Sequence, residues 1–209
     1  MTTADRMGES CKPMGLDLIP HALRSKFHFD EREHACAILA TDFPNEFQDM
    51  LDCLDWFTLR RSHILTPGGG RSPISKVIDD FLRERGWRPK SFDIKILVDG
   101  AAIPTPTHKI DNFKNRVGLE VEWNNKTEFY DRDLNNFRLL RELRVLSVGV
   151  IITRRTELQE LFDQLGKGPS YGSSTTHWDK LIPKVDGGGA GGCPLLLVGI
   201  GKRCYDPAS

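Results

Sequence analysis

The chain has 209 residues and equal numbers of basic and acidic side chains, so its formal net charge is zero. This balance excludes a polycation that coats nucleic acid through bulk charge, although it permits a local basic surface. No apolar run of about 18 residues is present, which excludes a membrane-spanning helix. The five cysteines form no CxxC pair, and no secretory leader pattern occurs at the N-terminus, so we expect a cytoplasmic protein with reduced thiols.

Helical periodicity organises the first half of the chain. Residues 1–15 resemble a loose N-terminal arm, and the segment TPGGGRSP (66–73) strongly interrupts regular structure. Pro44 suits the first turn of a helix, where its missing N–H group is not needed. Apolar residues at helical spacing predict helices over 29–39, 44–57 and 74–87.

Strands and helices alternate in the second half. The β-branched run at 146–154 predicts a strand that is buried on both faces. A helix that starts near 176 is expected to end before Pro183, and the glycine run at 187–192 is expected to be a flexible connector. The predicted strands are 92–98, 117–123, 146–154 and 194–200, and the predicted helices are 132–144, 156–166 and 176–182.

This order predicts an α/β fold in which a central mixed β-sheet carries helices on both sides. We expect one domain over residues 1–209, because too little chain follows the glycine run to make a second one. The sequence shows no internal repeat.

The strand at 117–123 contains an unusual acidic pair. Glu120 and Glu122 emerge on the same face of this strand, where two like charges repel each other and resist desolvation. A hairpin would place Asp111 beside Glu120. The carboxylates of Asp111 and Glu120, with the backbone carbonyl of Val121, then form a hard oxygen site suited to Mg²⁺. Glu122 would orient or deprotonate an attacking water.

A simpler interpretation of the acidic pattern remains open. The same carboxylates would also fit a solvated strand edge that Lys114 or Arg116 neutralises. Spacing alone does not decide between a metal site and such an edge.

Polar residues follow the acidic strand directly. Asn124 and Asn125 can make bidentate contacts to adenine, and Lys126 can reach the acceptors of guanine. The alternative is a polar turn with a local side-chain hydrogen bond.

Two glycine-flanked loops add further candidates for DNA contact. Ser173, Ser174, Thr175 and Thr176 form a hydroxyl cluster that suits base edges or phosphate oxygens, although one of them can instead cap the next helix. In the sequence GGGRS, Arg71 and the backbone amides can hold a phosphate, although the GK[ST] ending of a nucleotide-binding loop is missing. A plain flexible turn fits that segment equally well.

The pattern Asp-x8-Glu-x-Glu in an apolar strand, followed by WNNK and RDLNNFRLL, resembles the BglII/BstYI group of type II restriction endonucleases. This group belongs to the PD-(D/E)xK nuclease superfamily. The superfamily usually has lysine at the third catalytic position, where this chain has Glu122. Because a carboxylate cannot stabilise an anion, activation of water is the role implied for Glu122. The similarity is strongest over 108–154 and extends more weakly to 68–87, 171–181 and 187–200.

The resemblance implies a homodimer that cuts palindromic double-stranded DNA, with one active site for each strand. It implies Mg²⁺ at Asp111 and Glu120, a target centred on GATC, 5′-phosphate ends, and a loop within 171–181 that enters the major groove. A cognate DNA methyltransferase is expected as a genetic partner. Two alternatives stay open: a nuclease of the same fold without strict sequence choice, and a DNA-binding regulator without catalysis.

Overall fold

A computed structural model describes residues 15–66, 70–105, 107–172 and 174–208. Most of the expected N-terminal arm, 1–15, and the candidate DNA-contacting residue Ser173 therefore lie outside the described residues. Within the described part, no helix has the length and apolar character needed to cross a membrane.

A mixed β-sheet buries the acidic strand at its centre. The strand order is β1-β9-β8-β7-β6-β3, so β7 lies between two neighbours. Strands β7, β8 and β9 are parallel, whereas β6 runs antiparallel to β7 and β1 runs antiparallel to β9. The strands are β1 (His28–Arg32), β3 (Arg88–Lys90), β6 (Ile110–Lys114), β7 (Val117–Glu122), β8 (Val148–Arg154) and β9 (Leu195–Ile200).

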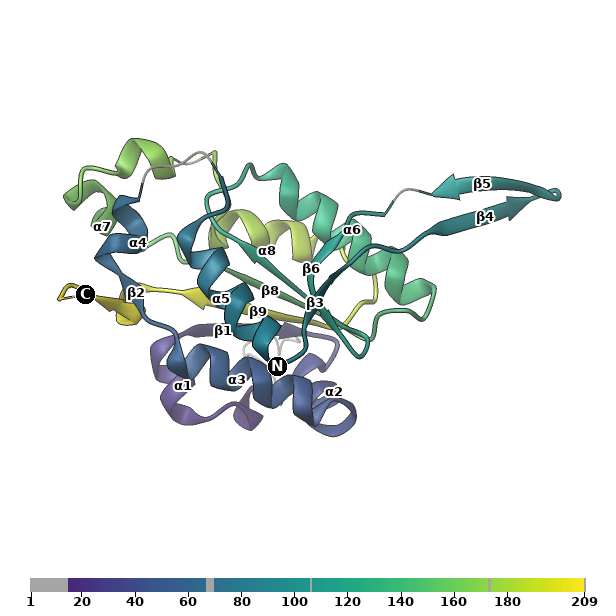
Figure 1. Cartoon of the computed structure of the whole chain (residues 1–209), viewed down its shortest axis with the longest axis horizontal. Coiled ribbons are helices and arrows are strands. Elements are labelled where there is room, and N and C mark those ends of the chain that lie inside the picture. The colour runs from purple at the N-terminus through teal and green to yellow at the C-terminus, as the bar shows by residue number, and fades with distance from the viewer. Residues whose placement is uncertain (1–14, 67–69, 106, 173, 209) are drawn as a thin grey trace, which may run out of the picture.

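Helices cover both faces of this sheet (Figure 1), which confirms the predicted fold class. One face packs on α1 (His21–Lys26), α2 (Ala35–Asp42), α3 (Pro44–Trp56) and α5 (Pro73–Glu84). The other face packs on α6 (Glu128–Glu142) and α8 (Trp178–Asp186). Successive side chains of β7 point to opposite faces of the sheet. Val117, Leu119 and Val121 therefore join the hydrophobic core under α1, α2, α3 and α5, and Glu120 and Glu122 face α6.

Short elements complete the described chain. They are α4 (Arg61–Leu65), α7 (Leu158–Gln164), the paired strands β2 (Leu59–Arg60) and β10 (Tyr205–Asp206), and the 3₁₀ turns η1 (Leu16–Leu18), η2 (Gly168–Tyr171) and η3 (Lys202–Cys204). The strand predicted over 92–98 forms as β4 (Ile94–Val98). It pairs with β5 (Ala101–Thr105) in a separate hairpin that projects from the body (Figure 1).

Several predicted helix limits are wrong; α6, for example, begins at Glu128, four residues before the predicted start. Residues 28–32 form strand β1, because pairing with β9 buries Phe29 and Glu31 on alternate positions. Helix α8 continues through Pro183 to Asp186, so the predicted end is too early. The buried side chains of Trp178, Leu181 and Val185 hold both turns of α8 against the core, which offsets the hydrogen bond that proline removes.

Candidate active site

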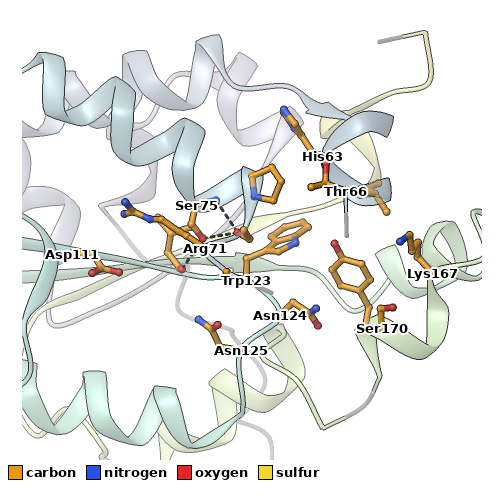
Figure 2. A pocket seen from close by; sticks show the side chains of 16 residues that line it. His63, Thr66, Arg71, Ser75, Asp111, Trp123, Asn124, Asn125, Lys167 and Ser170 are labelled. Atoms are coloured by element: carbon orange, nitrogen blue, oxygen red, sulfur yellow. Dashed lines mark hydrogen bonds between the residues drawn. The ribbon is translucent and has the colours of Figure 1, made fainter. Parts of the chain in front are cut away.

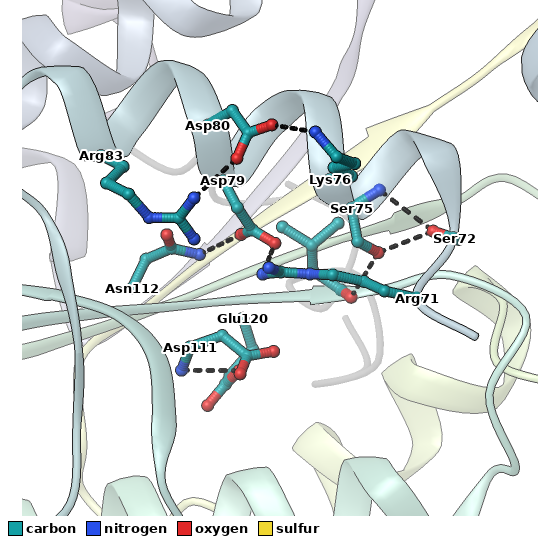
Figure 3. Close-up of polar contacts among 11 residues, drawn as sticks. Arg71, Ser72, Ser75, Lys76, Asp79, Asp80, Arg83, Asp111, Asn112 and Glu120 are labelled. Atoms are coloured by element: carbon teal, nitrogen blue, oxygen red, sulfur yellow. Dashed lines mark hydrogen bonds and ion pairs between the residues drawn. The ribbon is translucent and has the colours of Figure 1, made fainter.

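A tight hairpin places Asp111 beside Glu120. Strands β6 and β7 pair up to Lys114 and Val117, and the two turn residues between them, Asn115 and Arg116, have φ angles of 43° and 71°. Positive φ at both central positions is typical of the two-residue turn that matches the twist of a hairpin. The Asp111 N–H group donates to Glu120 Oε2 at 3.3 Å. The expected hairpin is therefore confirmed, and Figure 3 shows the two acidic side chains together.

Buried carboxylates crowd this end of the sheet. Glu120 and Glu122 are 2% and 3% exposed, and Asp133 of α6 is 1% exposed. Burial raises the pKa of Glu120 well above its ordinary value, and the charges of Asp133, Asp111 and Glu122 raise it further. The cluster therefore carries more negative charge than its surroundings neutralise.

Glu122 is held by three neighbours from outside its strand. Asn125 Nδ2 donates to Glu122 Oε2 at 2.8 Å, and Arg132 Nη2 lies 3.5 Å from Glu122 Oε1. Burial, the charge of Asp133 and a hydrogen bond to Asp133 raise the pKa of Glu122 to about 9. Burial also raises the pKa of Asp133, although the hydrogen bond from Glu122 acts in the opposite direction. Without a cation, this pair therefore favours a state in which one of the two carboxyls keeps a proton.

The donor chemistry of the cluster fits a divalent cation. Among the described residues, no three His, Cys, Asp or Glu side chains already form a group that could hold a metal ion. However, Asp111 and Glu120 supply carboxylate oxygens, which are hard donors. The Val121 carbonyl accepts a long bond of 3.4 Å from the Ser75 hydroxyl. Arg132 pairs with Glu122 and Asp133, which leaves the charge of Asp111 and Glu120 to be neutralised by something else.

The two polar segments expected to contact DNA lie against each other. Lys126 forms a β-bridge with Thr175, the Thr176 N–H group donates to the Asn125 carbonyl at 2.8 Å, and the Asn125 N–H group donates to Thr176 Oγ1 at 3.1 Å. Lys126 and Ser174 are exposed. The structure therefore joins 124–126 and 174–176 into one surface beside Glu122.

Some of these side chains already have partners inside the protein. The amide of Asn125 is bonded to Glu122, and Thr175 Oγ1 donates to the Gly172 carbonyl at 2.9 Å while accepting a bond from Arg154 at 3.0 Å. These contacts order the segments. Lys126 and Ser174, which are exposed, remain the side chains best placed to reach a base edge, whereas Asn124 is half-buried and its Oδ1 is enclosed.

Arg71 lines a neighbouring cavity of about 370 Å³, whose wall also includes Asp111, Asn124 and Asn125. Figure 2 shows these side chains arranged around it. Arg71 is ion-paired with the buried Asp79, which also accepts a bond from Asn112 (Figure 3). A phosphate in this cavity would thus compete with Asp79 for the guanidinium of Arg71.

A buried hydroxyl pair supports the end of the acidic strand. Tyr130 Oη and Thr153 Oγ1 are 2.6 Å apart, and Thr153 Oγ1 donates to the Glu122 carbonyl at 2.9 Å. Tyr130→Phe removes one of these bonds and keeps the ring. We expect it to lower the free energy of unfolding by about 1 kcal/mol, measured by urea titration. An unchanged unfolding midpoint would show that this bond adds nothing to stability; Tyr205→Phe, on a half-buried ring near the C-terminus, is the control.

Sequence reasoning missed Asp133 and Asp79 as parts of this site. Asp133 precedes Phe137 and Leu140 by four and seven residues, so it falls on the buried stripe of α6. An acidic residue on such a stripe is a sign of a buried polar cluster, and it could have identified Asp133. The closeness of Asp79 to Asn112 depends on how α5 packs on β6, which local spacing does not show.

Comparison with known proteins supports a nuclease. The family model described as restriction endonuclease BglII/BglIII matches residues 27–200, which include every described candidate residue above. No curated protein matches the chain. Because the matched segment spans most of the sequence, the chain belongs to the BglII/BglIII family of restriction endonucleases and is a DNA-binding nuclease.

Proposed function

We propose that the protein is a type II restriction endonuclease that hydrolyses phosphodiester bonds at a short palindromic site in double-stranded DNA. The reaction depends on Mg²⁺ and leaves 5′-phosphate ends. The target is centred on GATC, and the active form is a homodimer whose two-fold symmetry matches that of the site. One observation carries this proposal: Asp111 meets Glu120 in a buried acidic cluster, directly beside a polar surface suited to DNA.

Three groups are proposed to hold the metal: Asp111, Glu120 and the Val121 carbonyl. When bound, Mg²⁺ would relieve the repulsion among the carboxylates and stabilise negative charge on the phosphate oxygens. The argument for a cation is strongest at Glu120, because burial and neighbouring carboxylates raise its pKa and so disfavour its charged form when no cation is bound.

Glu122 is the proposed base. In the metal-free protein its pKa is about 9, and a cation held by Asp111 and Glu120 would lower this pKa and leave the carboxylate ionised. The ionised carboxylate would accept a proton from the attacking water while the water oxygen forms a bond to phosphorus and the bond from phosphorus to the 3′-oxygen breaks. The 3′-oxygen then takes a proton from solvent. Asn125 fixes Oε2 of Glu122 at 2.8 Å, so the carboxylate keeps one orientation during this transfer.

The polar surface beside Glu122 is proposed to read the bases. Asn124, Lys126 and Ser174 provide donors and acceptors, while the bonds between Asn125 and Thr176 fix the surface relative to the acidic cluster. Arg71 is proposed to hold a backbone phosphate near the cavity that it lines. Ser173 and Thr175 belong to the same proposed surface, although Ser173 lies outside the described residues.

Digestion of one phage genome, followed by sequencing of the fragment ends, tests the proposal. We expect discrete fragments that require Mg²⁺, with identical 5′-phosphorylated termini that share a palindrome. A smear would indicate a nuclease without strict sequence choice. Specific binding without any cut would indicate a regulator, and either result would contradict the proposed activity.

A further inference from the structure

A second cavity, of about 240 Å³, lies where β1 begins and β9 ends. Its wall is mainly basic. The charged or titratable side chains that line it are Arg24, Lys26, His28, Arg155, Glu157 and Arg203. We call it the cation pocket.

The positive charge of this pocket is only partly neutralised within the described chain. Among residues 15–66, 70–105, 107–172 and 174–208, Lys26, Arg155 and Arg203 have no carboxylate within 4.0 Å. Glu157 Oε1 accepts the backbone N–H group of Lys202 at 2.9 Å. Arg24 pairs with Asp17, and Lys26 Nζ donates to three backbone carbonyls, so Arg155 and Arg203 are the cations that can hold an anion bound there.

Arg155 is the side chain best prepared for such an anion. Its guanidinium has no hydrogen-bond acceptor among the described residues, and it lies over the ring of Trp178, 5.3 Å from the centroid. The stacking holds the planar group in place and leaves its N–H donors for a ligand. Arg203 uses one nitrogen to bind the Ser25 carbonyl at 2.8 Å, which fixes it at the other side of the pocket.

The cation pocket shares an edge of the sheet with the candidate active site. Strands β7, β8 and β9 are parallel, so Glu122, Arg155 and Gly201 lie at or just beyond their carboxyl ends. Two strand spacings separate the ends of β7 and β9, or about 10 Å.

The proposed base-reading surface lies between the candidate active site and the cation pocket. Thr176 is bonded to Asn125 next to Glu122, and two residues later Trp178 contacts both Arg155 and His28. The major groove of B-DNA is about 12 Å wide and has a phosphate backbone on each side. A groove read by 174–176 would therefore place one backbone at Glu122 and the other at the cation pocket.

We propose that the cation pocket binds a backbone phosphate of the strand that lies across the major groove from the cleaved phosphate, through Arg155 and Arg203. This inference rests on the proposed function, because it uses the position of the cleaved strand. It adds a site that contributes affinity and register and carries no sequence preference of its own.

The first test measures DNA affinity at 50–200 mM salt for the parent, Arg155→Gln, Arg203→Gln and the double variant. The logarithm of the association constant should depend less steeply on the logarithm of salt in the double variant, by about 0.9 for each lost phosphate contact or about 1.8 for a dimer that loses one contact in each protomer. Arg155→Lys should keep most of the parent's slope. Arg88→Gln, on β3 at the far side of the sheet, should keep all of it. An unchanged slope in a folded double variant would overturn the proposal.

The second test neutralises the DNA instead of the protein. A duplex carrying one methylphosphonate on the strand across the major groove from a cleaved phosphate should bind the parent more weakly, with little further loss in Arg155→Gln. Full additivity would show that Arg155 does not contact that phosphate. Inorganic phosphate, added at constant ionic strength, should not weaken DNA binding by the parent in the way that the methylphosphonate does. If Arg155→Gln abolishes binding of inorganic phosphate but leaves the DNA slope unchanged, the pocket holds a free anion and the proposal fails.

These results can be separated from failure of the proposed function. The duplex contains the site mapped from fragment ends, and if no site is found a random duplex serves, because phosphate contacts do not depend on sequence. If the parent cuts DNA into discrete fragments and the double variant keeps the parent's salt slope, only the proposed role of the cation pocket is wrong. If the parent gives a smear and the double variant has a reduced salt slope, the site-specific activity is wrong and the role of the pocket stands.

Discussion

Asp111→Asn is expected to lower the rate of DNA cleavage by a factor of about 10³ or more, while DNA affinity stays equal to that of the parent or rises. Loss of a carboxylate removes several kcal/mol of metal-assisted stabilisation, and each 1.36 kcal/mol corresponds to a factor of ten in rate. Binding survives because the change removes a negative charge that faces DNA phosphates. Single-turnover cleavage in Mg²⁺, with affinity measured separately by fluorescence anisotropy, checks both parts.

Glu120→Ala should have the same effect, because Glu120 and Asp111 are proposed to hold one ion. Asp99→Asn is the matched control, since Asp99 is exposed in the turn between β4 and β5. If Asp111→Asn cuts a plasmid as fast as the parent does, Asp111 is not a ligand of the proposed metal. Equal losses of cleavage and binding would instead indicate a structural role.

Local pattern predicted those parts of the fold in which neighbouring residues settle the conformation. Pro44 begins α3 as expected, and α5 begins at Pro73, the last residue of the segment TPGGGRSP. The β6–β7 hairpin follows from the spacing between Asp111 and Glu120 and from a two-residue turn. The family resemblance, now confirmed over 27–200, depended on the same hairpin.

The missed features depend on contacts between distant parts of the chain. Residues 28–32 form a strand because β9, more than 160 positions later, offers an unpaired edge. Strand preference depends on such pairing more than on the residues themselves. The same holds for the partners of Glu122: the nearby Asn125 could be found from sequence as a polar neighbour, whereas its hydrogen bond to Glu122 is visible only in the folded chain.

The pH dependence of stability offers a second large effect, which is independent of DNA. Burial and the negative charge of Asp133 raise the pKa of Glu122 from 4.5 to about 9. Between these values the folded protein keeps a proton that the unfolded chain releases. The free energy of unfolding of the metal-free protein therefore falls as pH rises through this window.

Glu122→Gln should remove this penalty, because glutamine has no proton to lose and can still bond to Asn125. In EDTA, the variant should match the parent near pH 4.5 and be more stable near pH 9, by on the order of 3 kcal/mol or roughly 10 °C in Tm. Glu84→Gln, which changes an exposed carboxylate on α5, should follow the parent at every pH. Thermal unfolding followed by circular dichroism across this range measures the difference. A constant gap between variant and parent would show that Glu122 is ionised in the folded, metal-free protein, because only a proton held after folding makes the gap grow with pH.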